Sequence, residues 1–241
     1  SELADIFNER LPVLIENFVA REQQVKFAES IASIISGGDN GLIEAGTGIG
    51  KTFGYLIPIM QSGDTAIVST GTRNLQDQLF LKDLPKLAEL FPEKRLSLLK
   101  GRANYLCVHR MRTSLKVVAK GENLDRLVQV RGWSSQTKTG DLTELLDPEE
   151  HPEIMRLVTS TRDNCLGSRC PDFDQCPLYL ARDKAAQSDL VVVNHHLLFA
   201  DLAQQEDALQ SLLPRAGIVL VDEAHRVPDV ARRFFSQQMS S

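Results

Sequence analysis

Residues 45–52 combine alternating glycines with a lysine and a threonine, a set that suits the binding of a nucleoside triphosphate. The glycines let backbone N–H groups come close to phosphate oxygens, and a helix that starts directly after them adds its dipole. We expect Lys51 to reach the β- and γ-phosphates and the Thr52 hydroxyl to bind Mg²⁺. A chance glycine-rich turn is disfavoured, because an apolar segment, this loop and a helical pattern follow in the required order. The expected ATP contacts in this loop are Ala45, Gly46, Thr47, Gly48, Ile49, Gly50, Lys51 and Thr52.

A second reactive pair, Asp222 and Glu223, comes at the end of an apolar run. A carboxylate at the end of a buried strand is placed to hold the same Mg²⁺, so Thr52 and Asp222 are the candidate Mg²⁺ ligands. Glu223 is then placed to orient and deprotonate the attacking water. Two acids at a strand end are common by themselves, and His225 alone would be an ordinary surface or core residue. The phosphate loop upstream favours catalysis, and the candidate catalytic residues are Lys51, Asp222, Glu223 and His225.

The four cysteines of the chain all lie between these two motifs, with one far upstream of the other three. Zinc ribbons usually hold their metal with two C-x₂-C pairs, and this sequence contains none. One distant and three near thiolates suit an iron–sulfur cluster better, and a proline directly after each of the last two cysteines would stiffen the ligand loop. Structural zinc and four unrelated buried cysteines are the less favoured alternatives. The candidate cluster ligands are Cys107, Cys165, Cys170 and Cys176.

The composition of the 241-residue chain is that of a soluble globular protein, with 42% apolar and 24% charged residues. No apolar run approaches the roughly 18 residues of a membrane span, and the acidic N-terminus is not a signal peptide. We therefore expect a cytoplasmic protein without a membrane partner, whose cysteines bind metal rather than form disulfides. A first residue other than Met suggests a processed or truncated chain.

The net charge of −5 argues against a nucleic-acid partner, but its distribution along the chain does not. Residues 94–138 carry eleven Lys and Arg against two acids, whereas residues 139–155 carry six acids and no Lys or Arg. A basic segment on an acidic body can focus a phosphate backbone onto one face. A solvated helical surface is the alternative, and we favour the nucleic-acid interpretation because Cys107 lies inside the basic segment.

The pattern of apolar runs predicts an α/β fold with a parallel sheet, because continuous apolar strands alternate with helices. The middle of the chain lacks this alternation and reads as a mostly helical insertion between two strands. We place the insertion at residues 96–186, so that residues 1–95 and 187–241 form the nucleotide-binding domain. Helices are expected at 21–36, 51–60 and 74–82, and strands at 41–45, 65–69, 96–99, 189–193 and 218–222.

In their order and spacing these motifs resemble the iron–sulfur helicases of superfamily 2, the XPD/DinG group, and most closely its bacterial DinG/YoaA branch. The resemblance covers almost the whole chain. The matching segments are 21–24 (the Q motif), 44–52 (motif I), 69–79 (motif Ia), 100–107 and 163–177 (the cluster ligands), 193–197, and the DEAH sequence at 222–225.

This resemblance implies a RecA-like P-loop NTPase domain with an inserted 4Fe-4S domain, in a 5′-to-3′ DNA helicase of repair or replication recovery. Such an enzyme hydrolyses ATP while it moves along single-stranded DNA and unwinds forked or duplex DNA, with a replication or repair protein as a partner. Gln24 would read adenine, with Arg21 beside it. Tyr105 would either stack on a base or pack in the core beneath the cluster. The other expected DNA contacts are Thr70, Thr72, Gln76, Arg102, Arg110 and Arg112.

The family places an arch domain and a second RecA-like domain, with an arginine finger, after the DEAH sequence. This chain stops at Ser241, so we expect an incomplete first motor domain that binds nucleotide weakly and unwinds nothing by itself. The missing finger corresponds to roughly 10³–10⁵ in rate in related phosphoryl transfers. Two other functions stay open: a DNA- and partner-binding iron–sulfur module without catalysis, and a P-loop ATPase with structural zinc.

Overall fold

The structure, a computed structural model, describes residues 2–46, 48–118, 120–204 and 212–238. The chain forms two compact units, one from residues 1–98 together with 185–241 and the other from residues 99–184. The second unit thus begins at residue 99 rather than at 96, because Leu96–Leu98 forms a strand of the sheet in the first unit. Within the described residues, no helix has the length and apolar character that crossing a membrane requires.

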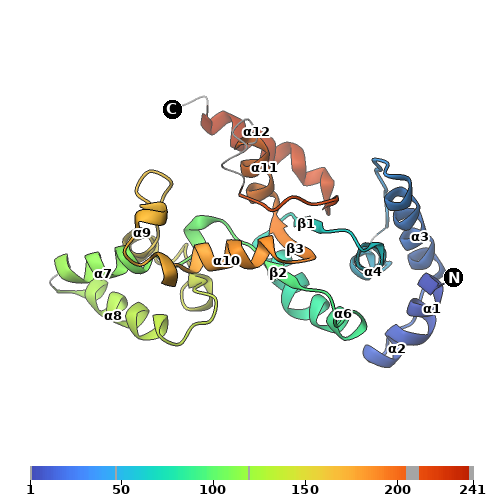
Figure 1. The fold of residues 1–241 in the computed structure, drawn as a ribbon, viewed down its shortest axis with the longest axis horizontal. Helices are drawn as coiled ribbons and strands as arrows, with labels where there is room; N and C mark the ends of the chain where they lie inside the picture. The colour runs from blue at the N-terminus through green and yellow to red at the C-terminus, as the bar shows by residue number, and fades with distance from the viewer. Residues whose placement is uncertain (1, 47, 119, 205–211, 239–241) are drawn as a thin grey trace. The chain divides into compact units, whose positions relative to one another are not determined.

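A four-stranded parallel sheet is the centre of the first unit (Figure 1). The sheet order is β2-β3-β1-β4, and Ala66 of β1 lies opposite Leu190 of β3 and Ile218 of β4. Strands β1 and β3 occupy the middle and are almost entirely buried, as continuous apolar runs require. The predicted α/β class with a parallel sheet is therefore confirmed. The strands are β1 (Ala66–Thr70), β2 (Leu96–Leu98), β3 (Leu190–Asn194) and β4 (Ile218–Val221).

The strand that we expected at residues 41–45 is not formed. These residues have no regular secondary structure, and Leu42 is 91% exposed. A short extended segment is stable only when a neighbouring strand satisfies its backbone groups. Within the described residues the sheet pairings involve only the strands β1, β2, β3 and β4, so none of them includes residues 41–45. The apolar residues of this segment predicted burial in the sheet, but the part of the chain that the structure describes offers them no pairing partner.

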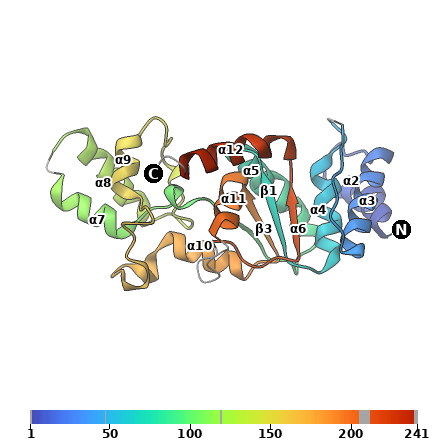
Figure 2. The ribbon, with the colours of Figure 1, turned by 90° about the horizontal axis from the view of Figure 1, so that it is seen from above.

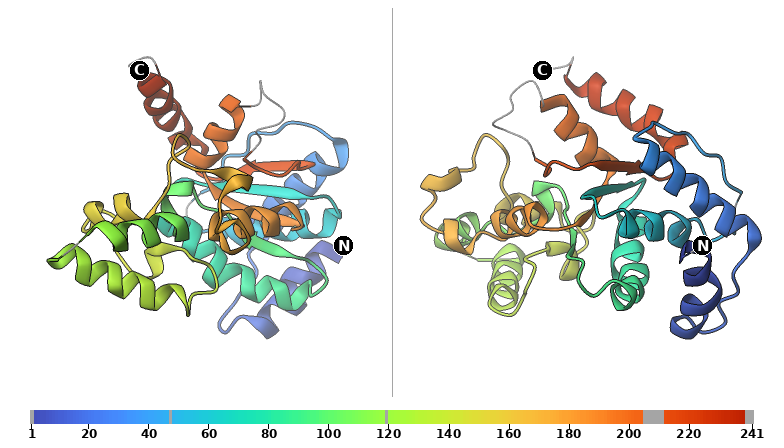
Figure 3. Two further views of the ribbon diagram at one scale, coloured as in Figure 1. Left: turned by 60° about the vertical axis from the view of Figure 1, so that its left-hand side comes forward. Right: turned by 45° about the vertical axis from the view of Figure 1, so that its right-hand side comes forward.

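Helices lie on both sides of the sheet, with α11 and α12 on one side and α6 on the other (Figures 1 and 3). Helix α3 packs beside α4 (Figure 2). The expected helix at 74–82 continues through a π-helical turn, Leu79–Asp83, into α6. The helices of this unit are α1 (Glu2–Asp5), α2 (Leu11–Leu14), α3 (Glu22–Gly37), α4 (Lys51–Ser62), α5 (Arg73–Gln78), α6 (Leu84–Leu90), α11 (His195–Gln204) and α12 (Val227–Gln238).

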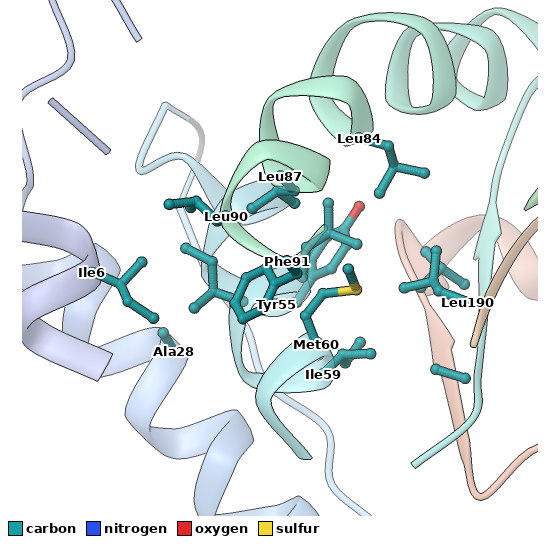
Figure 4. Close-up of a cluster of buried hydrophobic side chains, with 14 of the residues drawn as sticks. Ile6, Ala28, Tyr55, Ile59, Met60, Leu84, Leu87, Leu90, Phe91 and Leu190 are labelled. Carbon is teal, nitrogen blue, oxygen red and sulfur yellow. The ribbon is translucent and has the colours of Figure 1, made fainter. Parts of the chain in front are cut away.

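Helix α4 is the element that positions the phosphate loop, and it lies in the largest hydrophobic core (Figure 4). Its residues from Gly54 to Met60 are all buried, so the helix contacts protein on every side in this stretch. Pro58 does not end the helix, which continues to Ser62 and stops before Gly63, a glycine with φ of 80°. Burial on all sides fixes the direction of the helix and therefore of its first turn, which carries Lys51.

The second unit, residues 99–184, is mostly helical and has a hydrophobic core of its own. Leu127, Val130 and Leu142 are fully buried in this core. Short 3₁₀ turns connect the helices, including Gly167–Arg169 and Phe173–Gln175. The helices are α7 (Val108–Val117), α8 (Glu122–Ser134), α9 (Pro152–Val158) and α10 (Pro177–Ala186), whose last two residues belong to the first unit.

A buried ion pair joins Lys100 and Asp141 in this unit. The Lys100 Nζ lies 2.6 Å from Asp141 Oδ2, and the two side chains are only 4% and 9% exposed. Thr143 completes the arrangement, because its hydroxyl donates to Asp141 Oδ1 at 2.7 Å and accepts from Lys100 Nζ at 3.1 Å. Lys100 is therefore an interior residue, although it counted toward the basic segment in the sequence.

Replacing Asp141 by asparagine is expected to lower the free energy of unfolding by about 3–5 kcal/mol, because the Lys100 charge stays buried without its counter-ion. Asparagine keeps the size of the side chain and one carbonyl acceptor, so the substitution isolates the loss of charge. Denaturant unfolding followed by circular dichroism measures the change. The matched control is Asp125→Asn on an exposed position of α8, which should cost less than about 1 kcal/mol. Equal effects of both substitutions would contradict the prediction.

Candidate nucleotide site and candidate metal centre

Two glycines at the end of the phosphate loop have a left-handed backbone conformation. Gly48 and Gly50 have φ of 77° and 80°, a region that other residues rarely adopt. Helix α4 begins directly after Gly50, so Lys51 and Thr52 stand in its first turn and its free N–H groups face the loop. Thr47 lies outside the described residues. A helix N-terminus behind a glycine-rich loop is suited to hold phosphate oxygens.

The two residues expected near adenine contact the phosphate loop itself. Gln24 Nε2 donates to the carbonyl of Gly50 at 2.9 Å, and Arg21 Nη1 donates to the carbonyl of Gly48. Gln24 is 2% exposed, and a side chain at Gly50 would collide with its amide. In this structure the Gln24 amide therefore holds the shape of the loop. The sequence interpretation did not include this contact, because it expected the Gln24 side chain to read adenine.

The DEAH residues meet the phosphate-loop lysine across the site. Glu223 Oε1 lies 3.7 Å from Lys51 Nζ, and its other oxygen lies 3.4 Å from His225 Nε2. Asp222 follows β4 and is fixed by its backbone, which donates to the Ser69 carbonyl at 2.9 Å. The tertiary structure thus brings all four candidate catalytic residues together from α4 and from the turn after β4.

Glu223 has a strained backbone conformation. Its φ and ψ are 54° and 44°, and among the described residues Asn17 is the only other non-glycine residue with positive φ. For a residue with a Cβ this left-handed conformation costs roughly 1–2 kcal/mol. Such strain often marks a functional turn. Here the turn places the Glu223 carboxylate between Lys51 and His225.

Two residues of this site were missed in the sequence, and the first is Tyr55. It is 3% exposed, and its hydroxyl donates to Asp222 Oδ2 at 3.2 Å. Burial, followed by the nearby Asp222 charge, raises the pKa of Tyr55 well above its ordinary value. The ring therefore stays a neutral phenol. The only signal in the sequence was one hydroxyl within a run of apolar residues.

The second is His195, which is fully buried at the start of α11. Its Nδ1 lies 2.7 Å from Ser69 Oγ of β1. Burial lowers the pKa of His195, so the ring is neutral at physiological pH. His195 was part of the segment 193–197 that resembles the family, but nothing in the sequence indicated that it contacts Ser69 of β1.

The expected DNA contacts of motif Ia are mostly covered in this structure. Gln76 is fully buried, and its amide donates to the Val192 carbonyl at 3.4 Å. Thr70 is 2% exposed, and the Thr72 hydroxyl caps α5 by accepting from Leu75 N at 3.2 Å. Of the three, only Thr72 is accessible enough for a phosphate contact. The polar groups of Thr70 and Gln76 hydrogen-bond carbonyl groups inside the unit, so these side chains satisfy buried acceptors.

The four cysteines lie together in the second unit and none is in a disulfide. Cys107 precedes α7 and is anchored to the local core, because its N–H donates to the Val158 carbonyl at 2.7 Å. Cys170 and Cys176 each follow a 3₁₀ turn, and Cys165 is the exposed member. The Cys107 thiol interacts electrostatically with all three others.

The surroundings of the thiols differ. Burial raises the pKa of Cys107, and the neighbouring thiols add to this effect. Burial acts in the same direction on Cys165, but the Gly167 N–H and the Arg102 guanidinium outweigh it and lower the pKa of that thiol. Arg182 also interacts with Cys165 and Cys176 and had no role in the sequence interpretation. Positive charge beside thiols favours their ionised, metal-binding form.

Asp172 connects two basic residues next to Cys170. Its carboxylate pairs with Arg112 Nη1 and lies 3.5 Å from His109 Nδ1, and it is 8% exposed. His109, Cys170 and Asp172 bring one ligand atom each within 4.8 Å of one another. Arg112 thus has a carboxylate partner in this structure, although the sequence interpretation assigned it to DNA.

The remaining expected DNA contacts also have neighbours in the protein. Arg110 Nη2 donates to the Arg156 carbonyl at 2.8 Å, and Arg102 Nη1 lies 3.5 Å from Ser160 Oγ. Tyr105 is 5% exposed, and its hydroxyl accepts from Lys100 N at 3.1 Å. Burial raises the pKa of Tyr105 to about 12. A ring so covered offers no face to a base in this structure, which favours packing in the core over stacking on a base.

The chain is similar to one family profile and to several named proteins. The DEAD_2 family profile matches residues 72–241. The chain is 43% identical to the ATP-dependent DNA helicase YoaA of Haemophilus influenzae, over 100% of this chain and 38% of that protein. It is 40% identical to YoaA of Escherichia coli K12, over 96% and 37%, and 30% identical to the ATP-dependent DNA helicase DinG of Salmonella typhimurium, over 90% and 33%. The chain thus spans little more than a third of these curated relatives.

Proposed function

Because this chain belongs to the DEAD_2 family, we propose that it is the ATP-binding part of a 5′-to-3′ DNA helicase. The enzyme would couple ATP hydrolysis to movement along single-stranded DNA and to the unwinding of forked or duplex DNA. The printed names of the relatives support ATP-dependent helicase activity, and the resemblance of the motifs to the DinG branch supports the polarity. We place this activity in the cytoplasm, in DNA repair or replication recovery, with a protein of these processes as partner.

The observation that carries the proposal is the 3.7 Å approach of Lys51 and Glu223. The two residues are far apart in the sequence, and they come from the two motifs that nucleotide hydrolases need. Lys51 would neutralise charge on the β- and γ-phosphates, and Glu223 would orient and deprotonate the water that attacks the γ-phosphate. Asp222 and Thr52 would hold Mg²⁺, which supplies further charge neutralisation on the phosphates.

We further propose that residues 99–184 are an iron–sulfur domain inserted between β2 and β3, with Cys107, Cys165, Cys170 and Cys176 as ligands of a 4Fe-4S cluster. Four thiolates around one zinc ion would lie about 3.8 Å apart, because Zn–S bonds are about 2.3 Å long. Among the described residues the single close group of candidate ligands contains only one of the four thiols, Cys170. The wider spacing of the thiols supports a cluster rather than zinc. A cluster here would brace the unit at the point where DNA strands separate.

The helicase proposal predicts a dependence on the polarity of the DNA substrate. The complete gene product that carries this sequence should separate forked DNA with a free 5′ single-stranded tail at least about tenfold faster than DNA with only a 3′ tail. Strand separation is measured with a fluorophore and quencher on the two strands, in the presence of ATP and Mg²⁺. Lys51→Ala is the control and should abolish unwinding, since it removes the phosphate contact.

Two results would overturn the proposal. If Lys51→Ala is as active as the unsubstituted protein, the protein is a DNA-binding module that works without ATP hydrolysis. An ATPase that single-stranded DNA does not stimulate would indicate a P-loop hydrolase of another kind.

A further inference from the structure

Tyr55 stands where the hydrophobic core meets the nucleotide site. It lies on α4, one turn after Thr52, and its ring is buried among the residues of the core (Figure 4). Leu84 and Leu87 of α6 belong to the same cluster. The core thus fixes the position of the ring, and the hydroxyl is the one polar atom of the side chain.

That hydroxyl contacts Asp222, one of the two residues expected to bind Mg²⁺. It donates to Asp222 Oδ2 at 3.2 Å, from α4 to the residue that follows β4. The other expected ligand, Thr52, lies on α4 one turn before Tyr55.

The hydrogen bonds to Asp222 suit a metal ligand. Asp222 is held from two sides, because Oδ1 accepts from the Glu223 N–H at 2.8 Å while Oδ2 accepts from Tyr55. Hydrogen bonds of this kind from outside the coordination shell orient ligands and tune metal affinity.

We propose that Tyr55 is a positioning residue for the Mg²⁺ that accompanies the nucleotide, acting through Asp222. From α4, the helix that also carries Thr52, it holds the Asp222 carboxylate in place before the ion arrives. This inference rests on the proposed function, since it concerns the same nucleotide site. It assigns no chemical step to Tyr55, which reaches the reaction only through Asp222.

The test is Tyr55→Phe in the complete gene product, because phenylalanine keeps the buried ring and removes only the hydroxyl. The matched control is Tyr179→Phe, which makes the same chemical change on a half-exposed ring that packs against Phe173 in the other unit. Binding of a fluorescent, non-hydrolysable ATP analogue is measured while Mg²⁺ is titrated, and again in EDTA. The midpoint of the Mg²⁺ titration reports metal affinity without any hydrolysis.

Tyr55→Phe is expected to raise the Mg²⁺ midpoint by about 10–100-fold, the usual effect of losing an outer-shell partner. Affinity for the analogue in EDTA should stay the same, and Tyr179→Phe should change neither value. A double variant with Asp222→Asn should show little added effect of Tyr55→Phe, because both changes act on one interaction. Circular dichroism confirms that each variant is folded.

Two results would overturn the inference. An unchanged Mg²⁺ midpoint would show that the hydroxyl does not act on the metal ligands, and an equal loss of affinity with and without Mg²⁺ would show a general role in the fold. Failure of the proposed function appears differently. In that case the unsubstituted protein itself shows no Mg²⁺-dependent binding of the analogue.

Discussion

Replacing Glu223 by glutamine is expected to slow ATP hydrolysis by about 10²–10⁴-fold, the usual contribution of a general base. Glutamine has the same size and can still contact water, but it cannot accept a proton. The substitution also removes the ion pair with Lys51, whose Nζ lies 3.7 Å from the carboxylate. Lys51 is then free for phosphate, so ATP should bind as tightly as before or more tightly. The change therefore affects the chemical step and leaves ground-state binding intact.

Single-turnover hydrolysis by the complete gene product measures the rate, and binding of labelled ATP measures affinity separately. The matched control is Glu93→Gln, an exposed carboxylate that lies before β2 and should have no effect on either quantity. If Glu223→Gln retains the full hydrolysis rate, Glu223 is not the general base of the reaction. A parallel loss of rate and ATP affinity would instead indicate that Glu223 supports the shape of the loop.

Replacing Cys165 by serine is expected to abolish the proposed iron–sulfur cluster. Iron and acid-labile sulfide should fall from about four of each per chain to near zero, and the visible absorbance should disappear. Arg102 and the Gly167 N–H lower the pKa of Cys165, so this thiol is more easily ionised than Cys107, whose pKa burial raises. A serine hydroxyl at the same place stays protonated and is a poor ligand for iron. Protein purified without oxygen is required for the measurement.

Ser168→Ala is the control for this experiment, because it changes a small exposed side chain in the same loop and leaves all four cysteines in place. It should keep its iron and sulfide. Stoichiometric zinc in the unsubstituted protein would show that the four cysteines form a structural zinc site rather than a cluster. If the protein is folded and holds no metal, the proposal of a metal centre is wrong.

Much of the nucleotide-binding unit followed from the sequence. Strands β1, β3 and β4 each lie within one residue of their predicted limits, because continuous apolar runs are buried in a parallel sheet. Lys51 begins α4 as expected, because left-handed glycines and a helix start are local features. Local patterns of this kind need no knowledge of the partner segment, and the same is true of the order of the motifs.

Burial of polar residues could not be predicted in the same way. Gln76 and Lys100 read as candidates for contact with phosphates, yet both are interior residues with partners on distant segments. Tyr55 had no role in the sequence interpretation, yet its hydroxyl donates to Asp222. Whether a polar side chain meets solvent or a buried partner depends on which segments pack against it.

The sequence by itself determined the chemistry available to this protein: a phosphate loop, a pair of acids after a strand and four thiols. The tertiary structure decided which of these groups meet, because the packing of the nucleotide-binding unit brings Glu223, in the turn after β4, to within 3.7 Å of Lys51 at the start of α4. It also decided that residues 41–45 form no strand with any other described residues, because a strand forms only where a neighbour offers free backbone groups. Contacts between distant segments depend on packing over the whole unit, and no local pattern of residues encodes them.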